Sequence, residues 1–378
     1  LGLMLTRVDR PFLDREATVL GIDHGWRPTP RWNVRTRLFG SAIEQAGESV
    51  DDVGATVWAD YEMDRGWRQQ WIAMHFGNDL QLNDFGYLSR NSTNYLHWEV
   101  RKRFAEQPQT SRYSSKEWRW RASSNHNNHG EKLNDQFRMS REGQLRNGSY
   151  EYAQINVNSA GLNDTLLRGN GIVRLPANLN AYFEYERPRK GNWAHEVEVE
   201  AFGGGLAGNR KLGSAFWYGA TYFISDAFSL NAGLNVVRRP DWLIWQGAAQ
   251  GDLVGAFDGR ETTLRAGLDW NIDPRQELRV KLEAIAISAR AHDAWRFDAA
   301  GHAVAASDTV EDFQVRNLGF QVRYRYELAP LSYLYVVYAR GGYEQLAGTD
   351  GSNDALRDSF SLRNDEQLIV KLSYRFEL

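Results

Sequence analysis

The sequence predicts an all-β protein, a transmembrane antiparallel up-and-down β-barrel of about eighteen strands. Three observations predict this fold class: apolar and polar residues alternate along the whole chain, aromatic residues stand near strand ends, and short connections alternate with long ones. We expect both termini to be periplasmic, with short periplasmic turns and long extracellular loops. The expected location is the outer membrane of a Gram-negative bacterium, as an integral protein.

The alternation is clearest near the C-terminus. From Leu318 to Leu328 every second residue is apolar or aromatic, and the residues between them include Gln321, Arg323 and Arg325. This pattern indicates strands with two different faces. A soluble β-sandwich also alternates, but its strands run to about 5–6 residues, whereas these run to about 10–14, as a tilted membrane strand requires.

Tryptophan and tyrosine stand near the ends of many predicted strands, for example Trp32, Trp67, Trp120, Trp270 and Tyr374. Both residue types prefer the headgroup level of a bilayer, because their apolar rings carry one polar edge. These positions therefore favour a membrane barrel over a soluble β-fold.

The connections predict the orientation. Short links are expected at 63–66, 146–148, 225–227, 273–275 and 328–330, and long polar links at 78–92, 161–176, 240–259, 290–311 and 348–363. Segment 242–248 could form a further strand pair, but we assign it to an external loop. Because bacterial barrels have short periplasmic turns and long external loops, the series places both termini in the periplasm.

Composition limits the alternatives. The chain has 378 residues, a formal net charge of −3 and no cysteine, so it offers no disulfide and no thiolate metal site, and no basic excess points toward nucleic acid. The mean hydropathy of −0.57 does not argue against a barrel, because only every second strand residue faces lipid. We expect one barrel domain over residues 1–378 and no cofactor. Because Leu1 already lies in a predicted strand, we expect upstream sequence, including an N-terminal periplasmic domain, to be missing from this chain.

The last residues resemble the C-terminal signal by which barrel-assembly machinery recognises outer-membrane barrels. The residues that carry this resemblance are Lys371, Ser373, Phe376 and Leu378, where Ser373 replaces the usual glycine and Leu378 the common terminal aromatic. The partners expected on this basis are the assembly machinery during insertion and then outer-membrane lipid and lipopolysaccharide.

Three segments, 1–10, 163–170 and 363–376, carry a family resemblance that spans essentially the whole chain. Together they resemble the barrel region of the domain-of-unknown-function 5916 family. Members of that family commonly carry an N-terminal domain similar to family 9 carbohydrate-binding modules, which implies a missing periplasmic domain here. The family supplies no established activity.

Charged residues at alternate strand positions are the candidate lumen lining. They are Arg35, Arg37, Arg101, Arg103, Arg119, Arg121, Arg323 and Arg325, together with Glu184, Glu186, Glu196, Glu198 and Glu200. Opposed charges across a wet lumen would select polar or charged solutes. The alternative is that paired charges only brace the wall.

The sequence therefore favours a pore or binding channel for a polar solute, with oligosaccharide suggested by Trp242, Trp245, Trp295 and Tyr343 in or beside external loops. One alternative is a plugged barrel that docks a partner protein or its own periplasmic domain. A barrel enzyme is the third, but no Gly-x-Ser-x-Gly elbow, phosphate-binding loop or His-Glu-x-x-His motif is present, so we expect no enzyme.

No metal site is expected either. His126 and His129 lie in a loop rather than on a helix, and the calcium-loop pattern at 350–354 lacks its glycine and distal glutamate.

Overall fold

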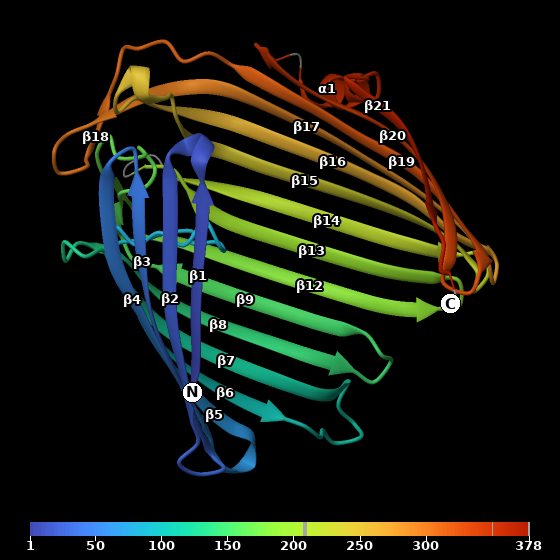
Figure 1. Ribbon diagram of the computed structural model, residues 1–378, viewed down its shortest axis with the longest axis horizontal. Helices are drawn as coiled ribbons and strands as arrows, with labels where there is room; N and C mark the ends of the chain where they lie inside the picture. The colour runs from blue at the N-terminus through green and yellow to red at the C-terminus, as the bar shows by residue number, and fades with distance from the viewer. Residues whose placement is uncertain (207–209, 350, 377–378) are drawn as a thin grey trace. The chain divides into compact units, whose positions relative to one another are not determined.

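The computed structural model describes residues 1–206, 210–349 and 351–376. The chain, whose strands are labelled in Figure 1, divides into two compact units, which are described separately. Unit 1 comprises residues 1–143, 154–163 and 174–179; unit 2 comprises residues 144–153, 164–173 and 180–378. Nearly all regular structure in both units is β.

The strands of unit 1 are long and consecutive in the chain. They are β1 (Gly2–Arg10), β2 (Arg15–Trp26), β3 (Trp32–Gln45), β4 (Glu48–Glu62), β5 (Trp67–Phe76), β6 (Thr93–Phe104) and β7 (Tyr113–His126), with the short β10 (Gly161–Asn163). Residues of both units contribute to β8 (Lys132–Leu145), β9 (Tyr150–Asn158) and the short β11 (Val173–Leu175). Single 3-10 turns occur at η1 (Pro11–Leu13) and η2 (Asp64–Gly66).

Unit 2 holds the remaining elements. They are β12 (Asn178–Lys190), which begins in unit 1, β13 (Trp193–Gly204), β14 (Lys211–Phe223), β15 (Phe228–Trp245), η3 (Ala248–Gln250), β16 (Val254–Asp273), β17 (Gln276–Phe297), β18 (Ala303–Ala305), β19 (Phe313–Ala329), β20 (Ser332–Ala347), α1 (Ser352–Ser359) and β21 (Asp365–Ser373). The described residues thus form 21 strands, and leaving out the three-residue β10, β11 and β18 leaves eighteen, the number predicted from the sequence.

Each long strand pairs antiparallel with the next one in its unit. In unit 1 the pairings run from β1 through β7. In unit 2 they run from β12 through β17 and on through β19 and β20 to β21, as the side-by-side strands of Figure 1 show. The prediction of antiparallel up-and-down connectivity is confirmed within each unit.

All five predicted short links are tight turns, for example 63–66 between β4 and β5 and 274–275 between β16 and β17. The loop 77–92 between β5 and β6 contains no strand, as predicted. In unit 1 the N-terminus lies at the strand ends that carry turns 27–31 and 63–66, because Gly2 pairs with Asp23 near the end of β2. In unit 2 the C-terminal end of β21 lies beside turn 330–331, because Ser373 pairs with Tyr333.

Two of the predicted long loops are wrong in extent. Segment 242–245 continues β15, where Trp242 pairs with Phe257 and Trp245 with Val254, so the assignment of 242–248 to an external loop is corrected. Similarly, β17 runs to Phe297, well into the segment 290–311. In both places a β-bulge, at 239–242 and at 291–293, shifts the register by a residue or more. A bulge breaks the period-two pattern, so the sequence pattern predicts an end at a place where the strand continues.

The predicted loop 348–363 contains the helix α1. Leu356 and Leu362 from this region pack against Ala284 of β17 and Leu318 of β19. No helix among the described residues is long and apolar enough to cross a membrane.

The last strand is shorter than predicted. β21 includes Lys371 and Ser373 and ends there, so Tyr374 and Phe376 lie beyond it, and Phe376 is exposed. Leu378, the final residue of the proposed insertion signal, lies outside the described residues, and that signal stays a prediction.

Candidate functional site: a charged sheet face with a recess

Each unit has one charged and one apolar sheet face. In unit 1, Arg35 pairs across the sheet with Trp58, and Glu99 pairs with Gln70 on one side and Arg121 on the other. The residues between them point to the opposite face. We call the face with Glu99 and Arg121 the charged face of unit 1.

Glu99 binds two arginines on this face. Its carboxylate accepts hydrogen bonds from Arg101 Nε at 2.5 Å and Arg121 Nη2 at 2.8 Å, and its side chain is 3% exposed. Arg119 is held by Glu117 and by Glu142, the latter at 3.0 Å. The predicted arginine ladder of β6 and β7 therefore exists, but Arg101, Arg119 and Arg121 each have an acidic partner.

The arginines of β3 are also paired. Arg37 Nε lies 2.8 Å from Asp23, and Arg35 lies 3.8 Å from Asp60. Asp60 in turn binds Arg68 at 2.9 Å and Gln70 at 2.9 Å. On this face positive charge is locally balanced.

In unit 2 the same arrangement surrounds Glu277 at the start of β17. Its carboxylate lies 3.2 Å from Arg325 and 3.5 Å from Arg323, and it also contacts Arg279. The two predicted arginines of β19 are thus brought together around one buried acid. We call the sheet face that carries Glu277, Arg323 and Arg325 the charged face of unit 2.

The predicted carboxylate cluster is different. Glu184 pairs across strands with Glu198, Glu186 with Glu196, and Tyr182 with Glu200. Like charges directly opposite one another are destabilising in a sheet. Among the described residues none of the five glutamates has a cationic partner within ion-pair distance, so no neighbouring cation offsets the acidic character of this patch.

Beside these glutamates, an aromatic ring lies flat on the charged face. Trp217 of β14 covers Gly233 of β15 so closely that a Cβ on Gly233 would lie 2.4 Å from the ring. The guanidinium of Arg265 lies 5.3 Å from the Trp217 ring centroid, and Arg265 Nε donates to Glu283 at 2.6 Å. A glycine inside a strand often marks a place where another group comes close to the backbone. At Gly233 that group is the Trp217 ring.

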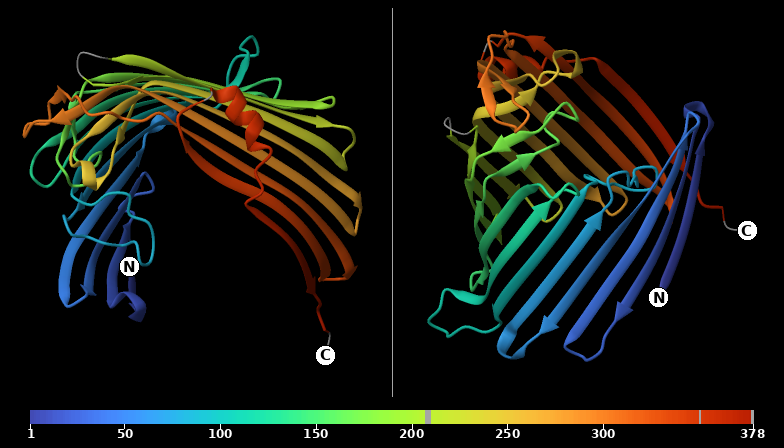
Figure 2. Two further views of the ribbon diagram at one scale, coloured as in Figure 1. Left: turned by 90° about the horizontal axis from the view of Figure 1, so that it is seen from above. Right: turned by 90° about the vertical axis from the view of Figure 1, so that its left-hand side faces the viewer.

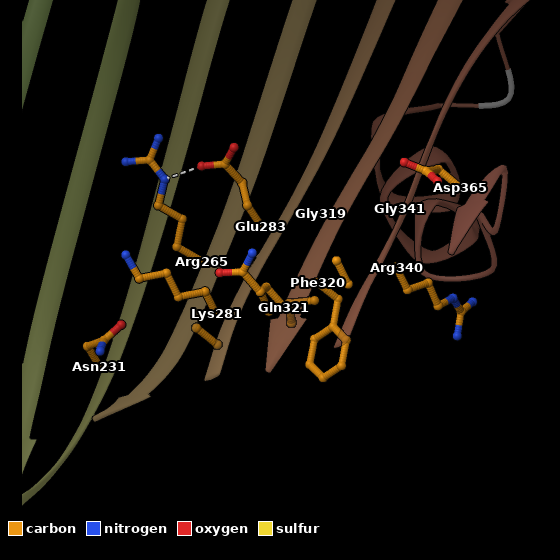
Figure 3. A pocket seen from close by; sticks show the side chains of 13 residues that line it. Asn231, Arg265, Lys281, Glu283, Gly319, Phe320, Gln321, Arg340, Gly341 and Asp365 are labelled. Atoms are coloured by element: carbon orange, nitrogen blue, oxygen red, sulfur yellow. Dashed lines mark hydrogen bonds and ion pairs between the residues drawn. The ribbon is translucent and has the colours of Figure 1, made fainter. Parts of the chain in front are cut away.

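The next strands hold a recess of about 590 Å³. Gly319 and Gly341 form part of its floor, and nothing lies within 4 Å of where a Cβ on Gly319 would be. Figure 3 shows Arg265 and Glu283 joined by their ion pair with Lys281 beside them, whereas Phe320 and Arg340 extend away from this group. The recess therefore offers charged and amide groups above an open backbone floor.

Comparison with known proteins gives the family. A family model described as domain of unknown function DUF5916 matches residues 2–377. The chain belongs to this family. None of the curated proteins matches the sequence of this DUF5916 chain.

Several solved structures are similar to it. The closed form of the ferric-catecholate import receptor Fiu from E. coli K12 has 11% identity and a TM-score of 0.45, over 90% of this chain and 64% of that one. The FpvAI–pyocin S2 complex has 10% identity and a TM-score of 0.42, over 99% and 55%. The outer-membrane expressed OmpT of Vibrio cholerae has 12% identity and a TM-score of 0.30, over 80% and 99%. This DUF5916 chain thus spans less than two thirds of the length of the first two.

All thirteen predicted lining residues lie on the charged faces of their units, although their place in a lumen stays a prediction. Trp217, Arg265 and Glu283 were not among them. The signal that could have found them is the interruption of strand patterns by glycine at Gly233 and Gly319, because glycine within a strand suggests that something approaches the backbone.

The aromatic residues expected in or beside external loops lie on strands, and Trp245 is the one that directly precedes a loop. Trp242 belongs to β15 and packs against Phe313, Trp295 lies in β17, and Tyr343 lies in β20. Trp245 ends β15 and donates to the carbonyl of Gly251 at 2.7 Å.

Metal binding finds no support in the part of the chain that the structure describes, where no group of three or more histidine, aspartate or glutamate side chains could hold an ion. His126 ends β7 and His129 lies in the following turn. Asp350 of the calcium-like pattern lies outside the described residues, and Ser352 to Asp354 begin α1.

Proposed function

We propose that this chain is an outer-membrane β-barrel whose charged faces line an aqueous lumen that passes or binds a polar solute. The observation that carries the proposal is the separation of the two faces. Large apolar side chains are exposed on the apolar faces, among them Leu38, Leu96, Trp98, Phe216 and Leu368. An apolar surface of this extent is unusual for a protein in water and is what lipid contact requires.

A groove on the apolar face of unit 1 supports lipid contact there. It has a volume of about 810 Å³ and is lined by Trp71, Trp98 and Phe137 with alanines between them. Hydrocarbon fits this lining better than water does, because the groove offers few polar partners.

Closure of the barrel is part of the proposal. β1 pairs with β2, and β21 pairs with β20, so the backbone N–H and C=O groups on the other edge of each strand still need hydrogen-bond partners. Backbone groups without partners cost several kcal/mol each in lipid, which favours joining these two edges. We propose that β1 and β21 pair antiparallel and that both chain ends are periplasmic.

Ion selectivity should come from the glutamates rather than from the arginines. The arginines near Glu99 and Glu277 each lie within ion-pair distance of an acid, whereas the glutamates at 184–200 have no cation at that distance among the described residues. A ring or patch of unpaired acids favours cations. The pore should therefore select cations over anions.

Planar-bilayer recording tests this proposal. We expect single-channel current with cation selectivity from the wild-type chain, and weaker selectivity from Glu186→Gln/Glu196→Gln, which removes one opposed pair. The matched control, Glu44→Gln/Glu48→Gln, removes two exposed acids at the turn between β3 and β4 and should keep the wild-type reversal potential. Absence of current would instead favour the plugged barrel that docks a partner.

A polyhydroxylated solute fits the recess of unit 2. Arg265, Glu283 and Gln321 supply donors and acceptors for hydroxyl groups, and Trp217 supplies an apolar ring nearby. Neutral oligosaccharides should then block the current in a concentration-dependent way, and Trp217→Ala should weaken the block. We propose no catalytic step, and hydrolysis of a lipid or glycan by the purified chain would contradict this.

A further inference from the structure

The loop 77–92 of unit 1 folds back over the charged face instead of extending away from the strands. The N–H of Asp79 donates to Asp52 at 2.8 Å, and the N–H of Gln81 donates to the Ser41 hydroxyl at 3.0 Å. Ser41 and Asp52 pair across β3 and β4, in register with Arg37 and Thr56 farther along, so they point to the charged face. Figure 2 shows this light-blue segment beside the strands β2–β4.

An apolar residue anchors the loop. Leu80 is 1% exposed and lies next to Phe39 and Gly54, where a Cβ on Gly54 would come within 3.0 Å of Leu80 Cδ2. Ala17 and Ile43 on the same face are also buried. In a single-layer sheet a face residue becomes buried when something covers it, and the loop contacts this end of the face.

An ion-pair cluster fastens the loop to the strands. Asp84 Oδ2 accepts from Arg15 Nη2 at 2.7 Å and from Arg15 Nε at 3.2 Å, and Arg10 Nη1 lies 3.3 Å from the same carboxylate. The side chain of Asp84 is 5% exposed. Arg15 also donates to Gln81 at 2.9 Å, so one arginine holds two positions of the loop.

We propose that this latched loop, residues 77–92, narrows the lumen and sets the size of solute that can pass, with the Asp84–Arg15 ion pair as its latch. The inference rests on the proposed function, because the loop narrows a passage only where the charged face lines one. A loop bound to an inner wall occupies part of the cross-section, as loops that plug other barrels do.

The latch is tested first without any current. In the full chain in detergent, Asp84→Asn removes the charge that Arg15 and Arg10 bind but keeps the size of the side chain. We expect the amides of Asp79 and Gln81 to exchange hydrogen at least tenfold faster than in wild type. Asp79→Asn is the matched control, because it removes the same charge from the same loop, and its side chain has no hydrogen bond or ion pair among the described residues. Equal exchange in Asp84→Asn and wild type would overturn the latch.

The narrowing is tested by current. A second variant replaces residues 78–91 with an Asn-Gly turn, which suits a two-residue connection between antiparallel strands. We expect this variant, and to a smaller extent Asp84→Asn, to show larger single-channel conductance and to admit larger polyethylene glycols than wild type. A change in electrophoretic mobility on heating checks that each variant has folded.

The outcomes separate the two proposals. Current of equal size and equal size limit in wild type and in the loop-replaced variant would overturn the narrowing while the pore stands. No current from any folded variant would overturn the pore, and the narrowing with it. A silent wild type with a conducting loop-replaced variant would overturn the open pore expected of the wild-type chain, but it would support the loop as the part of the chain that restricts the passage.

Discussion

Glu99 and Glu283 both bind arginine on a charged face, but their surroundings differ. Glu99 is almost fully buried between two arginines, whereas Glu283 and Arg265 are both about half exposed. Removing one partner of a buried pair leaves the other charges uncompensated, which costs far more than losing an exposed pair.

Glu99→Gln should therefore lower the free energy of unfolding by about 3 kcal/mol, the lower end for buried pairs because Arg101 and Arg121 retain some exposure. Glu283→Gln should lower it by less than about 1 kcal/mol. Urea-induced unfolding in detergent micelles measures both, and similar losses for the two variants would contradict the difference in burial.

Two glycines on the charged face of unit 2 differ in the space available for a side chain. A Cβ at Gly233 would overlap the Trp217 ring, whereas a Cβ at Gly319 would meet nothing. Gly233→Ala should destabilise the protein by about 1–3 kcal/mol through overpacking. Gly319→Ala should be neutral or stabilising by about 0.4–1 kcal/mol, because alanine restricts the unfolded chain. Melting temperatures of the two single variants decide whether the ring lies where it is described.

Lys102 shows what the sequence leaves open at this scale. It lies on the apolar side of β6, where the alternating pattern predicts an apolar residue and does not explain a charged one. Its ammonium donates to the Arg65 carbonyl at 2.5 Å and lies 5.1 Å from the rings of Trp67 and Phe104. That environment depends on the turn after β4, which is distant in sequence and carries no local signal.

At the scale of strands and loops, the period-two pattern predicted the strands well wherever the register is continuous. It failed at Pro240 and His292, because a bulge at each position moves later residues to the other phase. It also missed the fold-back of loop 77–92, because the contacts of Leu80 and Asp84 are made to strands earlier in the chain. The polar composition of residues 78–92 alone predicts only an ordinary external loop.

The latch of that loop should respond to acid. Arg15 holds the pKa of Asp84 below its ordinary value, so ionised Asp84 stabilises the latched state. This contribution is complete above the ordinary carboxyl pKa, about 3.9, and is lost as the pH falls through the lowered value. Hydrogen exchange at Asp79 and Gln81, corrected for intrinsic rates, should show the same protection at pH 7 and pH 5 and lose it only in acid below the ordinary carboxyl pKa.

Asp84→Asn is the control for that titration, because a neutral side chain has no proton to gain. Its exchange should already be fast at pH 7 and should show no further step in acid. Loss of protection near neutral pH in the wild type would point to a different group, since a lowered carboxyl pKa cannot produce it.

At the scale of the whole molecule, the fate of the two outermost strands decides whether the sheet can lie in a membrane. Leu5 on β1 is 66% exposed and Val370 on β21 is 63% exposed, and both belong to the apolar sides of their strands. Lipid can cover these side chains but cannot bond the backbone N–H and C=O groups of an open strand edge. A membrane-embedded sheet of this kind is therefore expected to close on itself.

Cysteine cross-linking tests closure directly, because these 378 residues include no cysteine. Leu5→Cys is combined in turn with Leu368→Cys, Val370→Cys or Leu372→Cys, which lie on the same side of β21. If β1 and β21 pair, one of these three should form an intramolecular disulfide in high yield, since directly opposed strand residues reach the required separation. Leu5→Cys with Ile369→Cys is the control, because Ile369 points to the other face and should stay reduced. Should all four double variants remain reduced in folded protein, β1 and β21 do not close the wall in any of these registers, and the lumen loses its physical basis.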